Sequence, residues 1–186
     1  QASAPPESAP GGAVAVLTAA GSGSRLGAGV PKALVPVGGV SLLRRAAAGF
    51  IASGAVSHVV VTAPAEEVDR FRAELEGLAD GSVGTSVGRR SGIEVVAGSP
   101  RSRQASVALG LAAALAAVPR ADVVIVHDAA RALTPPEVTQ RVVAAVRAGH
   151  EAVVPALPVT DTVKEVEARP AGEPEPVVGT PRRDRL

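Results

Sequence analysis

The chain has 186 residues, of which 46% are hydrophobic and 20% are charged, a balance typical of a globular domain with a real core. Nineteen basic and eighteen acidic residues leave a formal net charge of +1, so no broad positive surface is available for a nucleic-acid polymer or a membrane. Cysteine is absent, which excludes disulfides and cysteine-based sites and agrees with a cytoplasmic protein.

The two ends of the sequence differ in character from its middle. Residues 1–12 are Pro-rich, with neither the charged start nor the apolar centre of a targeting segment, and we expect a disordered tail. No apolar stretch approaches the roughly 18 residues that a membrane-spanning helix needs. Because the chain opens on Gln1 and ends on Leu186, we expect residues 13–186 to be a single domain that lacks its C-terminal portion.

Short runs of Val, Ile and Leu alternate with Ala-rich segments of helical length along the chain. Runs without in/out alternation are typical of strands buried on both faces, so the pattern predicts an α/β fold with a doubly wound, mostly parallel sheet and helices on both faces. The expected strands are residues 13–19, 56–62, 93–97, 123–127 and 152–156, and the expected helices lie near residues 42–53, 65–79, 106–117 and 136–148. Ser41 is the expected start signal of the first helix, Thr134 with two prolines that of the last, and Gly149 its end.

A glycine-rich loop follows the first predicted strand, with the sequence AAGSGSRLGAGVPK over residues 19–32. Glycines after a buried strand let backbone N–H groups approach a phosphate, and the following Arg25 and Lys32 supply opposing charge. A flexible turn is the alternative. A dinucleotide fingerprint fails because its sixth position is Leu26, but Lys32 favours a phosphate site, since only Lys32 and Lys164 of the 19 basic residues are lysines.

The predicted strand at residues 123–127 leads into the motif His127-Asp128-Ala129-Ala130-Arg131. Asp128 is a candidate Mg²⁺ ligand, because Mg²⁺ takes one or two carboxylates together with phosphate oxygens. The alternative is that Asp128 only caps the next turn. We expect His127 to be a packed or loop histidine, since no second histidine has ligand spacing to it.

Two basic segments, residues 98–106 and 180–183, are either solvated faces or further parts of an anion site. Residues 158–164, which follow the last predicted strand, mix β-forming and hydrogen-bonding side chains and predict a strand or arm that leaves the sheet.

Together these segments resemble the 2-C-methyl-D-erythritol 4-phosphate cytidylyltransferase family, whose pattern is A-A-G-x-G-x-R ending in P-K, then R-x-x-S-V, H-D-A-A-R and D-T-x-K. The matching residues are 19–25 with 31–32, 103–107, 127–131 and 161–164, in the family's order. The resemblance implies a Rossmann-like nucleotidyltransferase with a β-arm for dimerisation at about residues 157–183. It implies cytidylyl transfer from CTP to 2-C-methyl-D-erythritol 4-phosphate, a step of isoprenoid precursor synthesis by the non-mevalonate pathway.

The resemblance also assigns roles to individual residues. It implies Arg25, Lys32 and Asp128 as catalytic residues, with Asp128 binding Mg²⁺. The implied nucleotide-binding residues are Ala19, Ala20, Gly21, Gly23, Arg25, Lys32, Gly98, Arg103 and Ser106. The implied substrate-binding residues are Arg131, Thr162 and Arg183, the last two reaching from the partner subunit of a homodimer.

The chain departs from the family pattern in one extra residue between Gly98 and Arg103 and in stopping before the family's C-terminal segment. A ribitol-5-phosphate cytidylyltransferase is the nearest alternative, because it would share the nucleotide half of the site. A guanylyl- or sugar-nucleotidyltransferase would share only the glycine loop. The alternative from outside the enzymes is a non-catalytic fragment that binds a nucleotide.

Overall fold

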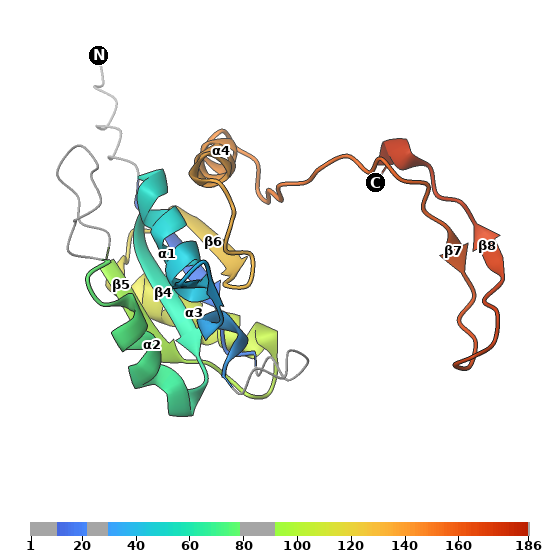
Figure 1. Cartoon of the computed structure of the whole chain (residues 1–186). Helices are drawn as coiled ribbons and strands as arrows, with labels where there is room; N and C mark the ends of the chain where they lie inside the picture. The colour runs from blue at the N-terminus through green and yellow to red at the C-terminus, as the bar shows by residue number, and fades with distance from the viewer. Residues whose placement is uncertain (1–10, 22–29, 79–91, 186) are drawn as a thin grey trace, which may run out of the picture. The chain divides into compact units, whose positions relative to one another are not determined.

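The computed structural model of the chain describes residues 11–21, 30–78 and 92–185. Its centre is a sheet of four parallel strands in the order β5-β4-β1-β6 (Figure 1). The strands are β1 (Ala13–Thr18), β4 (Val56–Ala63), β5 (Gly92–Ala97) and β6 (Val123–Asp128). A parallel sheet built from β-then-α units confirms the predicted fold class.

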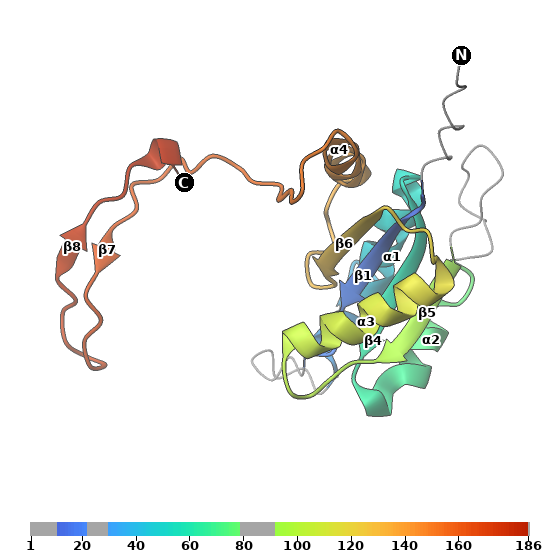
Figure 2. The same cartoon turned by 180° about the vertical axis from the view of Figure 1, so that it is seen from behind.

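Helices cover both faces of this sheet. They are α1 (Leu42–Ser53), α2 (Val68–Leu75), α3 (Arg103–Ala117) and α4 (Pro136–Arg147). Successive residues of a strand point to opposite faces, so Leu17 of β1 packs in the core that includes helices α1 and α2, whereas Val16 packs with α3. Figure 2 shows α3 crossing the face of the sheet opposite to α1 and α2. No helix in the described part of the chain has both the length and the apolar composition needed to cross a bilayer.

A glycine lets α3 lie close to the sheet. A Cβ atom on Gly110 would lie 2.6 Å from Cγ1 of Val16 and 2.9 Å from Cγ2 of Thr62. Only a residue without a side chain therefore fits between α3 and the two central strands. This close packing fixes the position of α3, whose first turn faces the carboxyl ends of the strands.

The helix boundaries follow capping groups. Ser41 caps α1 as predicted, with its hydroxyl accepting a 3.0 Å hydrogen bond from the amide of Arg44. Helix α3 begins at Arg103, three residues before the predicted start, because the Ser102 hydroxyl accepts from the amide of Ala105. Helix α4 begins at Pro136 as predicted, with no side-chain cap at its N-terminus.

The predicted strand at residues 152–156 was wrong, because residues 152–160 form no regular secondary structure. Val154 and Leu157 are 84% and 87% exposed. Apolar composition alone does not make a strand, since strand stability comes from packing and ladder partners, and this segment has no ladder hydrogen bonds in the structure.

Contacts divide the chain into two compact units, Gln1–Val153 and Val154–Leu186. The second unit contains a small antiparallel pair, β7 (Glu165–Val166) and β8 (Val177–Gly179). Most of the unit's described side chains are exposed, and the β7–β8 pair lies within residues 157–183, the part of the sequence expected to form a β-arm.

Candidate functional site

The described residues line a partly open cavity of about 620 Å³ at the carboxyl ends of the four parallel strands. In open α/β sheets, ligands bind in the crevice at this edge. The cavity is formed by the end of β1, the loops that follow β4, β5 and β6, and the first turns of α3. Its lining residues are Thr18, Ala19, Ala20, Gly21, Lys32, Ala33, Pro64, Ala65, Glu66, Gly98, Ser99, Pro100, Ser102, Arg103, Ser106, Asp128, Ala129 and Ala130.

The sheet ladder continues one residue beyond the strand ends and forms the floor of this cavity. The amide of Ala19 donates to the carbonyl of Thr62 over 3.0 Å, and the amide of Ala129 donates to the carbonyl of Thr18 over 3.0 Å. The amide of Gly98 donates to the carbonyl of Ala63 over 2.7 Å. The first residue of each loop is therefore held by the neighbouring strand.

The loops after β1 and β5 touch at Gly98. A Cβ atom at this position would lie 2.6 Å from Cβ of Ala20 and 3.1 Å from Oγ of Ser106. Glycine is required by this close approach, since a side chain would push the two loops apart. The structure thus brings together Ala20, Gly98 and Ser106, three of the predicted nucleotide-binding residues.

Ser106 is buried in the second turn of α3 and organises the loop before it. Its hydroxyl accepts a 2.9 Å hydrogen bond from the amide of Ser99 and lies 3.1 Å from the Ser99 carbonyl, to which it can donate. The loop between Gly98 and Arg103 is therefore tied by hydrogen bonds to the helix that follows it.

Lys32 also lines the cavity and comes from the segment that precedes α1. It begins the short 3₁₀ helix η2 (Lys32–Leu34), which follows Pro31 and buries Ala33 against the core. The amide of Leu42 donates to the carbonyl of Val35, which anchors the end of this segment to the start of α1. The ammonium of Lys32 is exposed and has no hydrogen bond or ion pair with any described residue, so its charge is available to a ligand.

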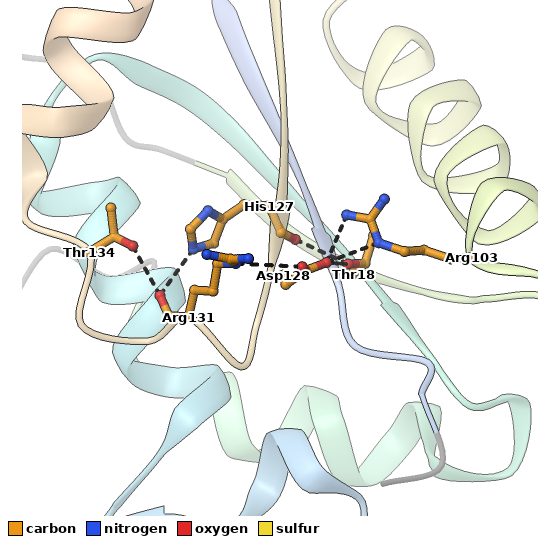
Figure 3. Close-up of polar contacts among 6 residues, drawn as sticks. All are labelled: Thr18, Arg103, His127, Asp128, Arg131 and Thr134. Atoms are coloured by element: carbon orange, nitrogen blue, oxygen red, sulfur yellow. Dashed lines mark hydrogen bonds and ion pairs between the residues drawn. The ribbon is translucent and has the colours of Figure 1, made fainter. Parts of the chain in front are cut away.

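Asp128 is the centre of the polar contacts in Figure 3. Its Oδ1 accepts hydrogen bonds from Thr18 Oγ1 at 2.8 Å and from Nε and Nη2 of Arg103 at 3.0 and 2.7 Å. Its Oδ2 lies 3.8 Å from Nε of Arg131. Arg103 and Arg131 approach the carboxylate from opposite sides (Figure 3).

These contacts keep Asp128 ionised. Burial raises the pKa of the Asp128 carboxyl, but hydrogen bonds from Arg103 and Thr18, together with the charges of Arg103 and Arg131, outweigh it. The pKa of Asp128 therefore lies below its ordinary value, and the group carries a full negative charge at neutral pH.

Arg131 and His127 have different roles in this loop. The carbonyl of Arg131 accepts from the Thr134 hydroxyl at 3.1 Å and lies 3.1 Å from Nε2 of His127, while the Arg131 side chain is 77% exposed. The His127 ring packs edge-on against Phe50 with centroids 5.3 Å apart. His127 is thus a packed histidine, as predicted, and the exposed Arg131 side chain, whose only described partner is Oδ2 of Asp128 at 3.8 Å, belongs to a residue outside the cavity lining.

The other predicted residues lie elsewhere. Gly23 and Arg25 are outside the described residues. Thr162 and Arg183 belong to the second unit, where Thr162 is exposed and Nη1 of Arg183 donates to the carbonyl of Thr160 over 2.8 Å. Their substrate-binding roles stay predictions, as do the roles assigned to the cavity residues.

Sequence reasoning missed Thr18, which lines the cavity and contacts Asp128. A signal was present, because Thr18 lies near the end of the strand predicted at residues 13–19, just before the glycines, and Asp128 directly follows the strand predicted at residues 123–127. Side chains at the ends of adjacent parallel strands lie next to each other. Glu66, in the loop after β4, was also missed and carries no comparable signal.

The donor set fits a cation that also binds phosphate oxygens. Asp128 and Glu66 are the acidic residues among those that line the cavity, and no group of three or more metal-ligating side chains occurs among the residues that the structure describes. Mg²⁺ needs only one or two carboxylates when a nucleotide supplies the other oxygens. An ionised Asp128 meets this requirement, whereas an all-protein metal site does not fit.

Comparisons with known proteins identify the family to which this chain belongs. The family model IspD, 2-C-methyl-D-erythritol 4-phosphate cytidylyltransferase, matches residues 13–186. The chain is 54% identical to the 2-C-methyl-D-erythritol 4-phosphate cytidylyltransferase of Saccharopolyspora erythraea, with 91% of this chain and 69% of that protein covered. It is 50% identical to the protein of the same name from Streptomyces avermitilis, with 92% and 65% covered.

A solved structure gives the same result. The 4-diphosphocytidyl-2C-methyl-D-erythritol synthase from Anaerococcus prevotii superposes with a TM-score of 0.70 at 25% identity, covering 95% of this chain and 67% of that one. The chain spans about two thirds of the length of these relatives. Since the family model matches residues 13–186 and these relatives are at least 50% identical over more than nine tenths of the chain, the chain belongs to the 2-C-methyl-D-erythritol 4-phosphate cytidylyltransferase family.

Proposed function

We propose that this chain binds CTP in the cavity and transfers its cytidylyl group to 2-C-methyl-D-erythritol 4-phosphate, giving 4-diphosphocytidyl-2-C-methyl-D-erythritol and pyrophosphate. The observation that supports this best is the grouping of the family's motif residues around one cavity: Ala19–Gly21, Lys32, Arg103 with Ser106, and Asp128. CTP and 2-C-methyl-D-erythritol 4-phosphate are proposed as the substrates because the chain belongs to this family.

The reaction needs positioning and charge more than acid–base chemistry. An oxygen of the acceptor phosphate attacks the α-phosphorus of CTP, the new P–O bond forms, and the bond to the β-phosphate oxygen breaks to release pyrophosphate. A phosphate monoester has a second pKa of about 6, so the nucleophile is already ionised at neutral pH without a general base. The ammonium of Lys32, which has no partner among the described residues, would stabilise charge that grows at the α-phosphorus. Arg25 would assist as the resemblance implies.

Asp128 would hold Mg²⁺ in this proposal. The ion would supply charge neutralisation on the nucleotide phosphates. The contacts from Thr18 and Arg103 support the role, because they keep the carboxylate ionised and in one place. Arg103 would move its guanidinium toward the nucleotide phosphates once the ion occupies the carboxylate.

The acceptor and the second subunit complete the proposal. Arg131, with its exposed guanidinium, would hold the acceptor phosphate, and Thr162 and Arg183 would reach the acceptor from the partner in a homodimer. A two-stranded pair is marginal by itself, and Val166, Val177 and Val178 of the β-arm are 42%, 59% and 61% exposed, which supports a partner surface for it. We place the reaction in the cytoplasm, consistent with the absence of cysteine.

The test is pyrophosphate release with CTP, Mg²⁺ and either 2-C-methyl-D-erythritol 4-phosphate or ribitol 5-phosphate. Turnover with the first acceptor is expected, and turnover only with the second would replace the assigned acceptor. Mg²⁺-dependent CTP binding without turnover would identify the chain as a nucleotide-binding fragment, which its coverage of about two thirds of the relatives makes a specific alternative.

A further inference from the structure

Thr18 and Asp128 end adjacent strands at the same level of the sheet. They are paired in the parallel register of β1 and β6, and the amide of Ala129 donates to the Thr18 carbonyl. The Thr18 hydroxyl lies 2.8 Å from Oδ1 of Asp128 and 3.2 Å from the carbonyl of His127, so the carboxylate is the nearer acceptor. Donor and acceptor are thus attached to the same backbone ladder.

The other partners of Asp128 are less constrained. The side chains of Arg103 and Arg131 are 60% and 77% exposed, and long guanidinium side chains readily turn to phosphate oxygens when a nucleotide offers them. Thr18 is half-buried and β-branched, with a single restricted side-chain torsion. A bound nucleotide would therefore recruit the arginines and leave the Thr18 hydrogen bond in place.

The two oxygens of Asp128 are engaged unequally. Oδ1 accepts from Thr18 and twice from Arg103, whereas Oδ2 has only the 3.8 Å ion pair with Arg131 among the contacts of the described chain. Rotation of the carboxylate would exchange the oxygens. A donor fixed on β1 opposes that rotation, so Oδ2 is the oxygen left available to a cation.

We propose that Thr18 is a positioning residue, whose hydroxyl holds the Asp128 carboxylate so that Oδ2 can take the cation that accompanies the nucleotide. The inference rests on the proposed function, in which Asp128 binds Mg²⁺. It adds a residue that precedes the family's A-A-G-x-G-x-R motif, which begins here at Ala19.

The neighbouring strand offers a matched control. Thr62 of β4 is paired in register with Thr18, but it is fully buried and its hydroxyl has no hydrogen-bond partner among the residues described. Replacing threonine by valine at either position keeps the β-branched shape and removes one hydroxyl. Only the hydroxyl of Thr18 contacts Asp128.

The experiment is calorimetric titration of CTP with and without Mg²⁺, using the parent chain, Thr18→Val, Thr18→Ser, Thr62→Val, Asp128→Asn and the double variant Thr18→Val with Asp128→Asn. The measured quantity is the ratio of CTP affinities with and without Mg²⁺. Thr18→Val is expected to lower this ratio about tenfold, the size of effect seen when a hydrogen-bond partner of a metal ligand is lost. Thr18→Ser and Thr62→Val should stay within about threefold of the parent, well below that loss. In the Asp128→Asn background, Thr18→Val should add nothing, because the residue acts through Asp128.

Other outcomes overturn the inference. The positioning role of Thr18 is wrong if Thr18→Val keeps the parental dependence of CTP binding on Mg²⁺, or if it weakens CTP binding equally with and without the ion. The role is also wrong if the losses of Thr18→Val and Asp128→Asn add in the double variant. None of these three outcomes affects the proposed function. If the parent chain binds no CTP in the presence of Mg²⁺, the proposed function is wrong, and the role of Thr18, which rests on it, is wrong as well. Circular dichroism checks the fold, and Thr18→Ala replaces Thr18→Val should the valine variant unfold.

Discussion

Lys32 lies at the cavity because its neighbours hold it there. Pro31 and the buried Ala33 fix the short η2 helix, and the ammonium has no partner among the described residues. A compact ammonium can approach a single phosphate oxygen, whereas a guanidinium is planar and wider. The two cations are therefore not interchangeable at this position.

We predict that Lys32→Ala lowers kcat and kcat/KM together by about 10²–10³, the loss typical of one charge-stabilising donor. Lys32→Arg should restore little of this activity, because its geometry is wrong although its charge is kept. Initial rates of pyrophosphate release measure both variants. Arg70→Ala is the control, since Arg70 is an exposed cation on α2 that pairs with Glu67 at 3.5 Å. Near-parental rates for Lys32→Ala would contradict the assigned role.

Asp122 forms a second ion pair of structural importance at the opposite end of β6. Its oxygens accept from Nε and Nη2 of Arg147 at 3.0 and 3.1 Å, and the same Nη2 donates to the carbonyl of Gly11. The hydrogen bond from Arg147 lowers the pKa of Asp122 below its ordinary value of 3.8, against a smaller opposing effect of burial. The pair joins the last turn of α4 to the start of β6.

This pair predicts a dependence of stability on pH. Because the pKa of Asp122 is lower in the folded chain than in the unfolded one, the stabilisation is complete above the unfolded pKa and is lost as the pH falls through the folded pKa. We expect Asp122→Asn to reduce the free energy of unfolding by up to about 1 kcal/mol at neutral pH. Urea unfolding of both chains at pH 7 and in acid measures this difference. A difference that persists unchanged below the folded pKa would rule out the ion pair as its source.

At the scale of elements, the close approach of α3 to the sheet depends on Gly110. Alanine there would gain up to about 1 kcal/mol in helix propensity, but its Cβ would lie within 3 Å of methyl groups on Val16 and Thr62. Overpacking of this kind costs about 1–3 kcal/mol. The steric cost therefore outweighs the gain in propensity.

We predict that Gly110→Ala lowers the free energy of unfolding by up to about 2 kcal/mol, which is what remains of the steric cost after a gain in helix propensity of about 1 kcal/mol. Gly49→Ala in α1 is the matched control, because its Cβ would make only an ordinary 3.6 Å contact with the carbonyl of Thr134. That variant should be stabilised by up to about 1 kcal/mol. Thermal and denaturant unfolding compare the two, and equal effects would show that steric contact at α3 is unimportant.

The success of sequence reasoning varied among these elements for physical reasons. Helix α1 was predicted with its observed bounds, since Ser41 caps it and Gly54 ends it in a left-handed conformation. The start of α3 was displaced because Ser102 was not identified as a cap. Residues 152–156 are apolar but unpaired, and no local pattern reveals whether a strand finds a partner.

The candidate site was predictable where a motif is contiguous. The loop at residues 19–21, Lys32 and Asp128 were each indicated by residue type and position, and the structure places them around one cavity. Contacts across strands were not predictable in the same way. The hydrogen bonds of Asp128 with Thr18 and Arg103 join residues more than 20 positions apart, and they depend on strand order and helix placement.

At the scale of the whole molecule, the cavity predicts nucleotide preference. The loops after β1 and β5 meet at Gly98, and the resemblance to cytidylyltransferases implies that the space beside Ser106 suits a pyrimidine. We expect CTP with Mg²⁺ to raise the melting temperature more than ATP, GTP or UTP does. Thermal unfolding with each nucleotide measures the preference, and equal or greater stabilisation by a purine nucleotide would count against the assignment.

The backbone bonds that form the floor of the cavity have a consequence for its motions. The amides of Ala19, Gly98 and Ala129 donate to neighbouring strands, so each hydrogen bond must open before its proton can exchange. Their protons should therefore exchange with deuterium more slowly than those of loop amides without such bonds, even without ligand. The floor of the site would then be preformed, and nucleotide binding would order the surrounding side chains without first having to build the surface beneath them.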